Sequence, residues 1–168
     1  MDLNKPLIDA VLLGDQHAIR HILSIGGNIN SSDERGLTPL HWSAASDAGE
    51  ELVPVLLSLG SKLDTRDKLG HTPLHLHSAK GRLFGVSCLL NQGCDSNARV
   101  HKTLQTPLHL ACNNDHPEVS RVLLAYGAKM SVRDADGAKP NEIWTKDLGS
   151  RNLSSGDGTG TEGSGKYD

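Results

Sequence analysis

One four-residue string constrains this chain more than any other feature. Threonine-proline-leucine-histidine occurs three times at a constant spacing of 34 residues, beginning at Thr38, Thr72 and Thr106. Thr is a favourable N-cap because its hydroxyl accepts a hydrogen bond from a free N–H of the first helical turn. Pro fits the first helical position because no N–H is needed there. Each copy therefore predicts the start of a helix, and the constant period predicts a repeat array.

The three copies agree well beyond this string. Each continues with a pair of small residues, a run of aliphatic or thiol side chains and a glycine. These are Ala44-Ala45, Ser78-Ala79 and Ala111-Cys112; Val55-Leu56-Leu57, Cys88-Leu89-Leu90 and Val122-Leu123-Leu124; and Gly60, Gly93 and Gly127. Over about residues 3 to 144 the pattern closely resembles the ankyrin repeat family. The resemblance implies an all-α solenoid in which each repeat has a β-hairpin loop and two helices.

The register of these copies sets the expected domain boundaries. An ankyrin domain is expected over residues 3–148, with four repeats and a partial fifth at 3–32, 33–66, 67–99, 100–133 and 134–148. The first repeat lacks the string and is interpreted as an N-terminal cap. The Gly/Ser-rich residues 149–168 predict a disordered tail or flexible linker. The end of the array leaves open a shortened isoform, a cut-off fragment or an array that a partner closes.

Three departures from the repeat pattern predict local irregularity. An extra residue near Asp47 and a proline at Pro54 predict a kinked or shortened second helix in the second repeat. His77 replaces a small residue, so it is either tightly packed or displaces its helix from the neighbour. Leu104 stands where other hairpins have glycine, and a left-handed turn there would be strained. We therefore expect this loop to adopt a different conformation.

Composition excludes several classes of function. The formal charge is −3, from 17 basic and 20 acidic residues, with no clustered basic footprint for nucleic acid. Cys88, Cys94 and Cys112 cannot pair completely and lack zinc-ligand spacing, which favours a reducing compartment. No apolar run approaches membrane-spanning length. We expect a monomer without cofactor or membrane insertion, in the cytoplasm or nucleus. Redox sensing by Cys94 is an alternative that we weigh below an inert thiol.

The histidines do not indicate catalysis or metal binding. His41, His75 and His109 share one repeat position, and the family resemblance implies that this side chain hydrogen-bonds between neighbouring hairpins. His71 and His77 flank His75 in sequence, but no nearby carboxylate or thiol completes a tetrahedral metal set. The chain also has no phosphate-binding loop and no Gly-x-Ser-x-Gly nucleophile motif. The sequence therefore predicts a protein that is not an enzyme.

Asn97 raises one possibility of modification. It occupies the hairpin position that ankyrin-directed asparaginyl hydroxylases modify in animals, and Asn30 holds the same place in the first repeat. The alternative, which we favour, is that the side chain bonds the backbone of a turn, as short polar side chains do.

The resemblance implies a protein-interaction module that binds a partner through its concave face of hairpin tips and first helices. Trp42 is either an exposed binding anchor or packs between first helices. A mildly basic strip of Lys68, His71, Lys80, His101 and Lys102, flanked by acidic Asp47, Glu50 and Glu51, would complement an acidic and apolar partner segment. The predicted protein-binding residues are Leu12, Leu13, Arg35, Leu37, Trp42, Ser46, Lys68, Leu69, His71, Lys80, Lys102, Gln105, Asn113 and Asn114.

Two other functions remain as alternatives. Short four-repeat ankyrin proteins inhibit cyclin-dependent kinases and usually have an irregular second repeat, so an enzyme regulator of this kind is the second hypothesis. A metal- or redox-dependent activity is the third, and the sequence offers almost nothing in its favour.

Overall fold

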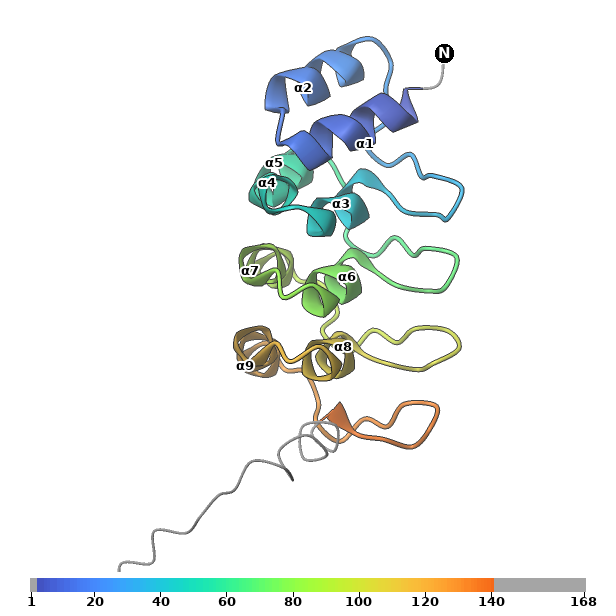
Figure 1. Ribbon diagram of the computed structural model, residues 1–168, viewed down its shortest axis with the longest axis vertical. Coiled ribbons are helices and arrows are strands. Elements are labelled where there is room, and N and C mark those ends of the chain that lie inside the picture. The colour runs from blue at the N-terminus through green and yellow to red at the C-terminus, as the bar shows by residue number, and fades with distance from the viewer. Residues whose placement is uncertain (1–2, 141–168) are drawn as a thin grey trace, which may run out of the picture.

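The computed structural model describes residues 3–140 as a single stack of helix pairs (Figure 1). The first helix of each pair lies in one column and the second in another, and the hairpin loops all project to the same side. The first and second pairs are α1 (Asn4–Leu13) with α2 (Gln16–Ser24), and α3 (Pro39–Trp42) and the 3-10 helix η1 (Ser43–Ala45) with α4 (Asp47–Glu51) and α5 (Val53–Ser58). The third and fourth are α6 (Pro73–Ala79) with α7 (Leu83–Asn91), and α8 (Pro107–Asn113) with α9 (Pro117–Ala125).

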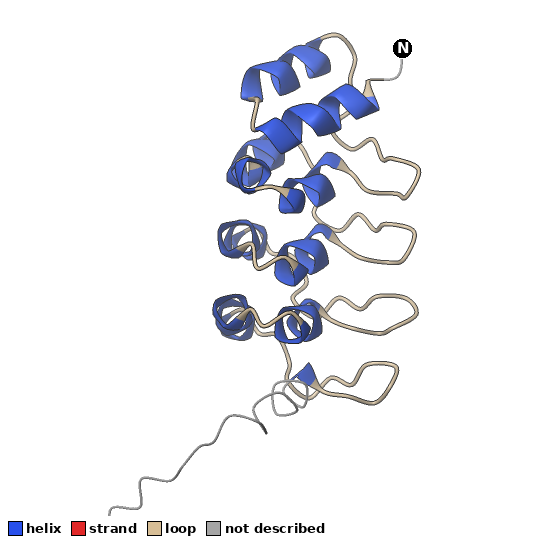
Figure 2. Cartoon of the chain, viewed as in Figure 1, coloured by secondary structure: helices blue, strands red, loops and turns tan. Residues whose placement is uncertain are grey.

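The predicted all-helical class is confirmed for the described part of the chain, in which no residue is assigned to a strand (Figure 2). The hairpins are closed by turns. Asp33 N donates to Leu37 O at 3.0 Å, and Asp67 N donates to His71 O at 2.9 Å. The predicted first helix of the fifth repeat beyond Pro140 and the predicted tail over 149–168 lie outside the described residues.

The recurring histidine joins each repeat to the next. His75 is fully buried, and its Nδ1 accepts a hydrogen bond from Thr72 N at 3.1 Å. Its Nε2 lies 3.3 Å from Gln105 O on the following hairpin. His41 and His109 repeat this arrangement, with Nε2 at 3.1 Å from His71 O and 3.2 Å from Ala138 O. The predicted bond between neighbouring hairpins is therefore confirmed in all three copies.

These imidazoles are neutral links. Burial lowers the pKa of His75 to about 4 and also lowers the pKa values of His41 and His109. In the neutral ring, Nδ1 accepts from the threonine while Nε2–H donates to the next carbonyl. Both ring nitrogens are thereby used, which a buried polar side chain requires.

The core is a continuous line of aliphatic side chains between the two helix columns. Eight large side chains in this core are each less than 2% exposed, and burying one contributes about 1.5–3 kcal/mol. These are Leu7, Ile19, Leu40, Leu56, Leu74, Leu89, Leu108 and Leu123. Because each repeat covers its neighbour with such residues, an aromatic core is not needed.

The second repeat is the irregular one, as predicted. Its second helix is divided into α4 and α5, with Leu52 between them. Pro54 lies in the first turn of α5, where its missing N–H removes no helical hydrogen bond. The third repeat holds the divided helix in place, because Glu50 Oε1 accepts from Gly85 N at 2.9 Å and Asp47 pairs with Arg82.

His77 is tightly packed, which decides between its two predicted alternatives. It is fully buried, and its Nε2 lies 3.0 Å from Ser43 Oγ in the preceding repeat. A Cβ placed on Gly85 would lie only 2.2 Å from His77 Nδ1, so the glycine of α7 provides the space for the ring. In the fourth repeat the equivalent pair is Ala111 and Val119. There the first helix carries the small residue and the second helix the larger one.

The hairpin loop that contains Leu104 was predicted only in part. The loop differs from its neighbours, as expected, because Leu104 N donates to Val100 O four residues back, whereas Gly70 N donates to Asp67 O three residues back. However, Leu104 still adopts the left-handed conformation, with φ of 55°, that we expected the loop to avoid. Keeping the register of the hairpins outweighs a strain of about 1–2 kcal/mol.

The stacked core makes a direct prediction. Leu89→Ala should reduce the free energy of unfolding by about 2–5 kcal/mol, because it opens a cavity where no side-chain surface is exposed. Lys102→Ala, on an exposed hairpin turn, should change it by no more than about 0.5 kcal/mol. Urea unfolding followed by circular dichroism measures both, and equal losses would contradict the assigned register.

The complementary sizes of His77 and Gly85 predict a coupled pair. Gly85→Ala should destabilise the fold by about 1–3 kcal/mol through overpacking. In the His77→Ala background the same change should cost at least about 0.5 kcal/mol less, because the ring no longer occupies the space. The matched control is Gln92→Ala, at the exposed end of α7. Strictly additive effects in a double-mutant cycle would argue against this pairing.

Candidate functional site

The hairpin turns and the first helices form one side of the stack, here called the hairpin face (Figure 1). Most of the residues predicted to form a binding surface there are exposed. Leu69 is 59% exposed at the tip of the third-repeat hairpin and Leu13 is 77% exposed at the end of α1. The other exposed members are Arg35, Lys68, Lys80, Lys102, Asn113 and Asn114, while Leu12, Trp42 and Gln105 are half-buried.

Three predicted binding residues have structural roles within the fold. Leu37 is only 8% exposed, and its N–H donates to Asp33 Oδ1 at 2.9 Å, so its assignment as a surface residue is wrong. Ser46 caps α4 by accepting from Gly49 N and donates to Leu12 O in the preceding repeat. His71 Nδ1 lies 3.1 Å from Asp67 Oδ2, within its own hairpin.

The imidazole of His71 is engaged by the carboxylate of Asp67 and is therefore less available to a partner. Burial of the carboxyl would raise its pKa, but hydrogen bonds from the backbone N–H and the imidazole of His71 lower it overall. The basic strip therefore depends on its exposed members Lys68, Lys80, His101 and Lys102. The acidic flank is also partly engaged, since Asp47 and Glu50 contact Arg82.

Trp42 is fixed at the edge of the hairpin face. Its indole N–H donates to Asp33 Oδ2 at 3.1 Å, and the guanidinium of Arg35 lies 5.1 Å from the ring centroid. The ring is half-buried, so burial alone does not decide between its two predicted interpretations. It borders a pocket of about 610 Å³ that sequence reasoning missed, lined by Asn4, Lys5, Ile8, Asp9, Leu12, Ser31, Ser32, Asp33, Glu34 and Trp42.

Asn97 and Asn30 have the same structural role. Asn97 Nδ2 donates to Gly127 O at 2.9 Å, and its Oδ1 accepts from Lys129 N at 2.8 Å. Asn30 makes the equivalent pair of bonds to Gly60 O at 3.0 Å and from Lys62 N at 2.8 Å. We call this two-bond link the asparagine clasp. It supports the favoured alternative, in which the side chain bonds backbone groups.

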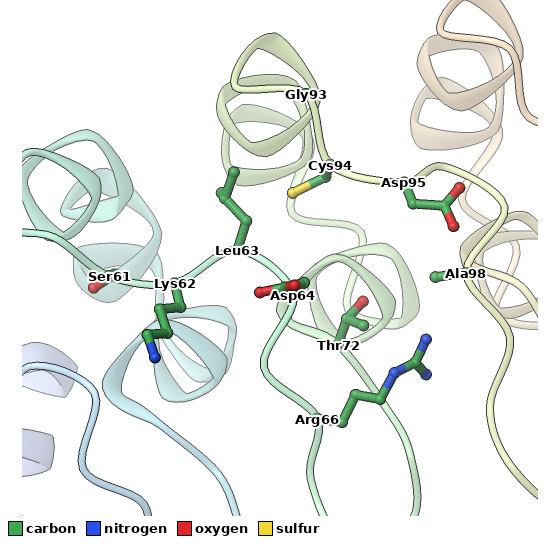
Figure 3. A pocket seen from close by; sticks show the side chains of 10 residues that line it. All are labelled: Ser61, Lys62, Leu63, Asp64, Arg66, Thr72, Gly93, Cys94, Asp95 and Ala98. Carbon is green, nitrogen blue, oxygen red and sulfur yellow. The ribbon is translucent and has the colours of Figure 1, made fainter.

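The clasp is absent between the second and third repeats. Asp64 stands at the equivalent position, and a carboxylate cannot donate to the carbonyl of Gly93. A pocket of about 690 Å³ opens there between the loops that follow α5 and α7 (Figure 3). Asp64, Asp95 and Cys94 line it. Burial and these two carboxylates raise the pKa of the Cys94 thiol to about 12, which disfavours the thiolate that redox sensing needs.

Within residues 3–140 no three His, Cys, Asp or Glu side chains are placed to share a metal ion. No helix in this range is both long and apolar enough to cross a membrane.

The described residues form four pairs of stacked helices, which hairpins link through a recurring Thr-His pair, and this arrangement defines a helical repeat protein. Comparison with known sequences identifies the class further: residues 43–134 match the family model for ankyrin repeats in three copies, and the chain belongs to this family. The predicted resemblance is thereby confirmed.

Several curated proteins are similar to this chain. The ankyrin repeat, SAM and basic leucine zipper domain-containing protein 1 of Dasypus novemcinctus is 35% identical over 130 residues, covering 75% of this chain and 27% of the relative. Protein phosphatase 1 regulatory subunit 27 of Mus musculus is 35% identical over 75 residues, covering 44% of this chain and 48% of the relative. The aligned segments thus span less than half of each relative.

The missing clasp predicts a stabilising substitution. Asp64→Asn should raise the free energy of unfolding by about 1–2 kcal/mol, because the new amide can donate to Gly93 O and accept from Asp95 N. Asn97→Ala should lower it by about 1–3 kcal/mol by removing both existing bonds. Asp64→Ala is the control that removes the charge without adding a clasp. Thermal unfolding that finds Asp64→Asn no more stable than Asp64→Ala would contradict the argument.

Proposed function

We propose that this chain is a protein-interaction module that holds a partner protein on its hairpin face. Ankyrin repeats imply protein–protein interaction. The main support for this site is that different groups of each hairpin hold the loop and face the solvent. Backbone groups and buried Thr-His pairs fix the loop, while the side chains of Lys68, Leu69 and Lys102 extend into solvent without an ion pair in the described structure.

The extent and setting of the module form part of this proposal. It comprises the array over residues 3–148, followed by a linker or tail over 149–168, and acts as a monomer in the cytoplasm or nucleus. Asn97 is the position proposed for hydroxylation. An added hydroxyl on its Cβ leaves both amide atoms available for the clasp, so modification and structure are compatible.

A regulator of an enzyme is the second candidate. The division of α4 from α5 favours it, since an irregular second repeat is the feature on which the comparison with kinase inhibitors rests. A relative that bears the name of a protein phosphatase 1 regulatory subunit also favours this class. In this candidate the hairpin face binds the enzyme itself, so the surface is the same and only the nature of the partner differs.

Affinity capture from a lysate of the source cells tests the proposal. Trp42→Ala combined with Lys68→Ala and Lys102→Ala should lose at least one specific partner that the wild type recovers. The matched control carries Ser58→Ala, Gln92→Ala and Arg121→Ala, on the second-helix side. Because Trp42 is half-buried, Lys68→Ala with Lys102→Ala serves as a second variant, and circular dichroism verifies folding.

Equal recovery by the wild type and the hairpin-face variants, with loss in the control, would place the site on the second helices instead. Where the captured partner is an enzyme, its activity with an equimolar amount of this chain decides between the two candidates. Stoichiometric suppression supports the regulator, and unchanged activity supports the adaptor.

A further inference from the structure

We propose that the pocket beside α1 is a subsite for an extended peptide segment in which an aliphatic side chain adjoins a lysine or arginine. This inference rests on the proposed interaction function and specifies the chemistry of the partner. The cavity, here called the α1 pocket, lies between α1, the loop over residues 31–34 and Trp42 on α3.

The floor of the α1 pocket is apolar because the first repeat lacks the histidine. Ile8 stands at the register position of His41, directly after the Pro6-Leu7 that replaces proline-leucine of the string. In later repeats this imidazole donates to the carbonyl of the next hairpin, which an isoleucine cannot do. Ile8, Leu12 and the ring of Trp42 therefore present carbon surface to the pocket. A volume of about 610 Å³ has room for an aliphatic side chain and part of its neighbour.

The rim of the pocket is acidic. Asp9, Asp33 and Glu34 face a single lysine, Lys5, so the lining side chains carry a formal charge of −2. Asp33 is already engaged by Trp42 and by backbone N–H groups. Asp9 and Glu34 are exposed and form no ion pair in the described structure. Carboxylates around an apolar recess concentrate a negative potential there, which favours a cationic group.

Beside the pocket, the guanidinium of Arg35 is held by two of the pocket's lining residues. Arg35 lies over the ring of Trp42, and its Nε is 3.8 Å from Asp33 Oδ2. A cation near an aromatic face gains electrostatic attraction from the ring. Arg35 is not among the residues lining the pocket, so it leaves Asp9 and Glu34 available to a second cation. The same face therefore has an acidic recess at its first repeats and exposed lysines, Lys68 and Lys102, further along.

Selection from a display library of random dodecapeptides, with the full chain as bait, tests the inference. Enriched peptides should carry a lysine or arginine next to an aliphatic residue. Asp9→Asn with Glu34→Gln should weaken their binding about three- to tenfold, measured by fluorescence anisotropy with labelled peptides. The control, Glu51→Gln with Asp136→Asn, removes the same charge at exposed positions away from the pocket and should leave affinity unchanged.

Tryptophan fluorescence locates the bound peptide. In a Trp144→Phe background only Trp42 reports, and its emission should shift on binding. Enriched peptides without a basic residue, no shift of Trp42, or equal weakening by the control would overturn the α1 pocket. A library that yields no binder also overturns it. Peptides that lose affinity with Lys68→Ala and Lys102→Ala, but not with Asp9→Asn and Glu34→Gln, overturn the pocket while leaving the interaction module intact.

Discussion

The hydrogen bond from a buried imidazole to the next hairpin is the interaction on which the array depends. His41, His75 and His109 each join the threonine that begins a helix to a carbonyl one repeat further on. The bond fixes the start of the helix and the spacing of adjacent hairpins together. Because the hairpins are held by atoms inside the fold, their outward side chains are free to differ, and the hairpin face can carry specificity without affecting the stack.

The junctions between repeats differ in their hydrogen bonds on the loop side. The first and third have an asparagine clasp on the loop side, through Asn30 and Asn97. The second lacks it. On the helix side all three junctions are bonded: Ser46 Oγ donates to Leu12 O in the first, Arg82 Nε donates to Ala44 O at 3.1 Å in the second, and His116 Nε2 lies 3.2 Å from Ala79 O in the third. The second junction also has the contact between His77 and Ser43. The divided helix of the second repeat belongs to the same junction. Its extra residue is held by polar partners from the third repeat, and its proline is accommodated because it lies in the first turn of α5.

Sequence reasoning predicted the features that a local rule governs. The helix starts at the threonine-proline pairs, the shared role of the three histidines and the irregular second helix near Pro54 each follow from short-range chemistry. It was wrong where register prevailed over local preference, since Leu104 accepts the left-handed conformation. It missed the α1 pocket because Asp9, Glu34 and Trp42 come from separate elements that only stacking brings together. Leu37 was misplaced because a hairpin position alone does not reveal which side chain turns inward.

The buried imidazoles also make this scaffold sensitive to protons. Burial lowers the pKa values of His41, His75, His77 and His109, with those of His75 and His77 reduced to about 4 from 6.5. The folded chain thus stays unprotonated at these sites while an unfolded chain takes up protons once the pH falls below about 6.5. Proton uptake favours the unfolded state, so the stability that these links provide is complete above that pH and declines toward pH 4. An acidified environment therefore weakens the links between repeats together.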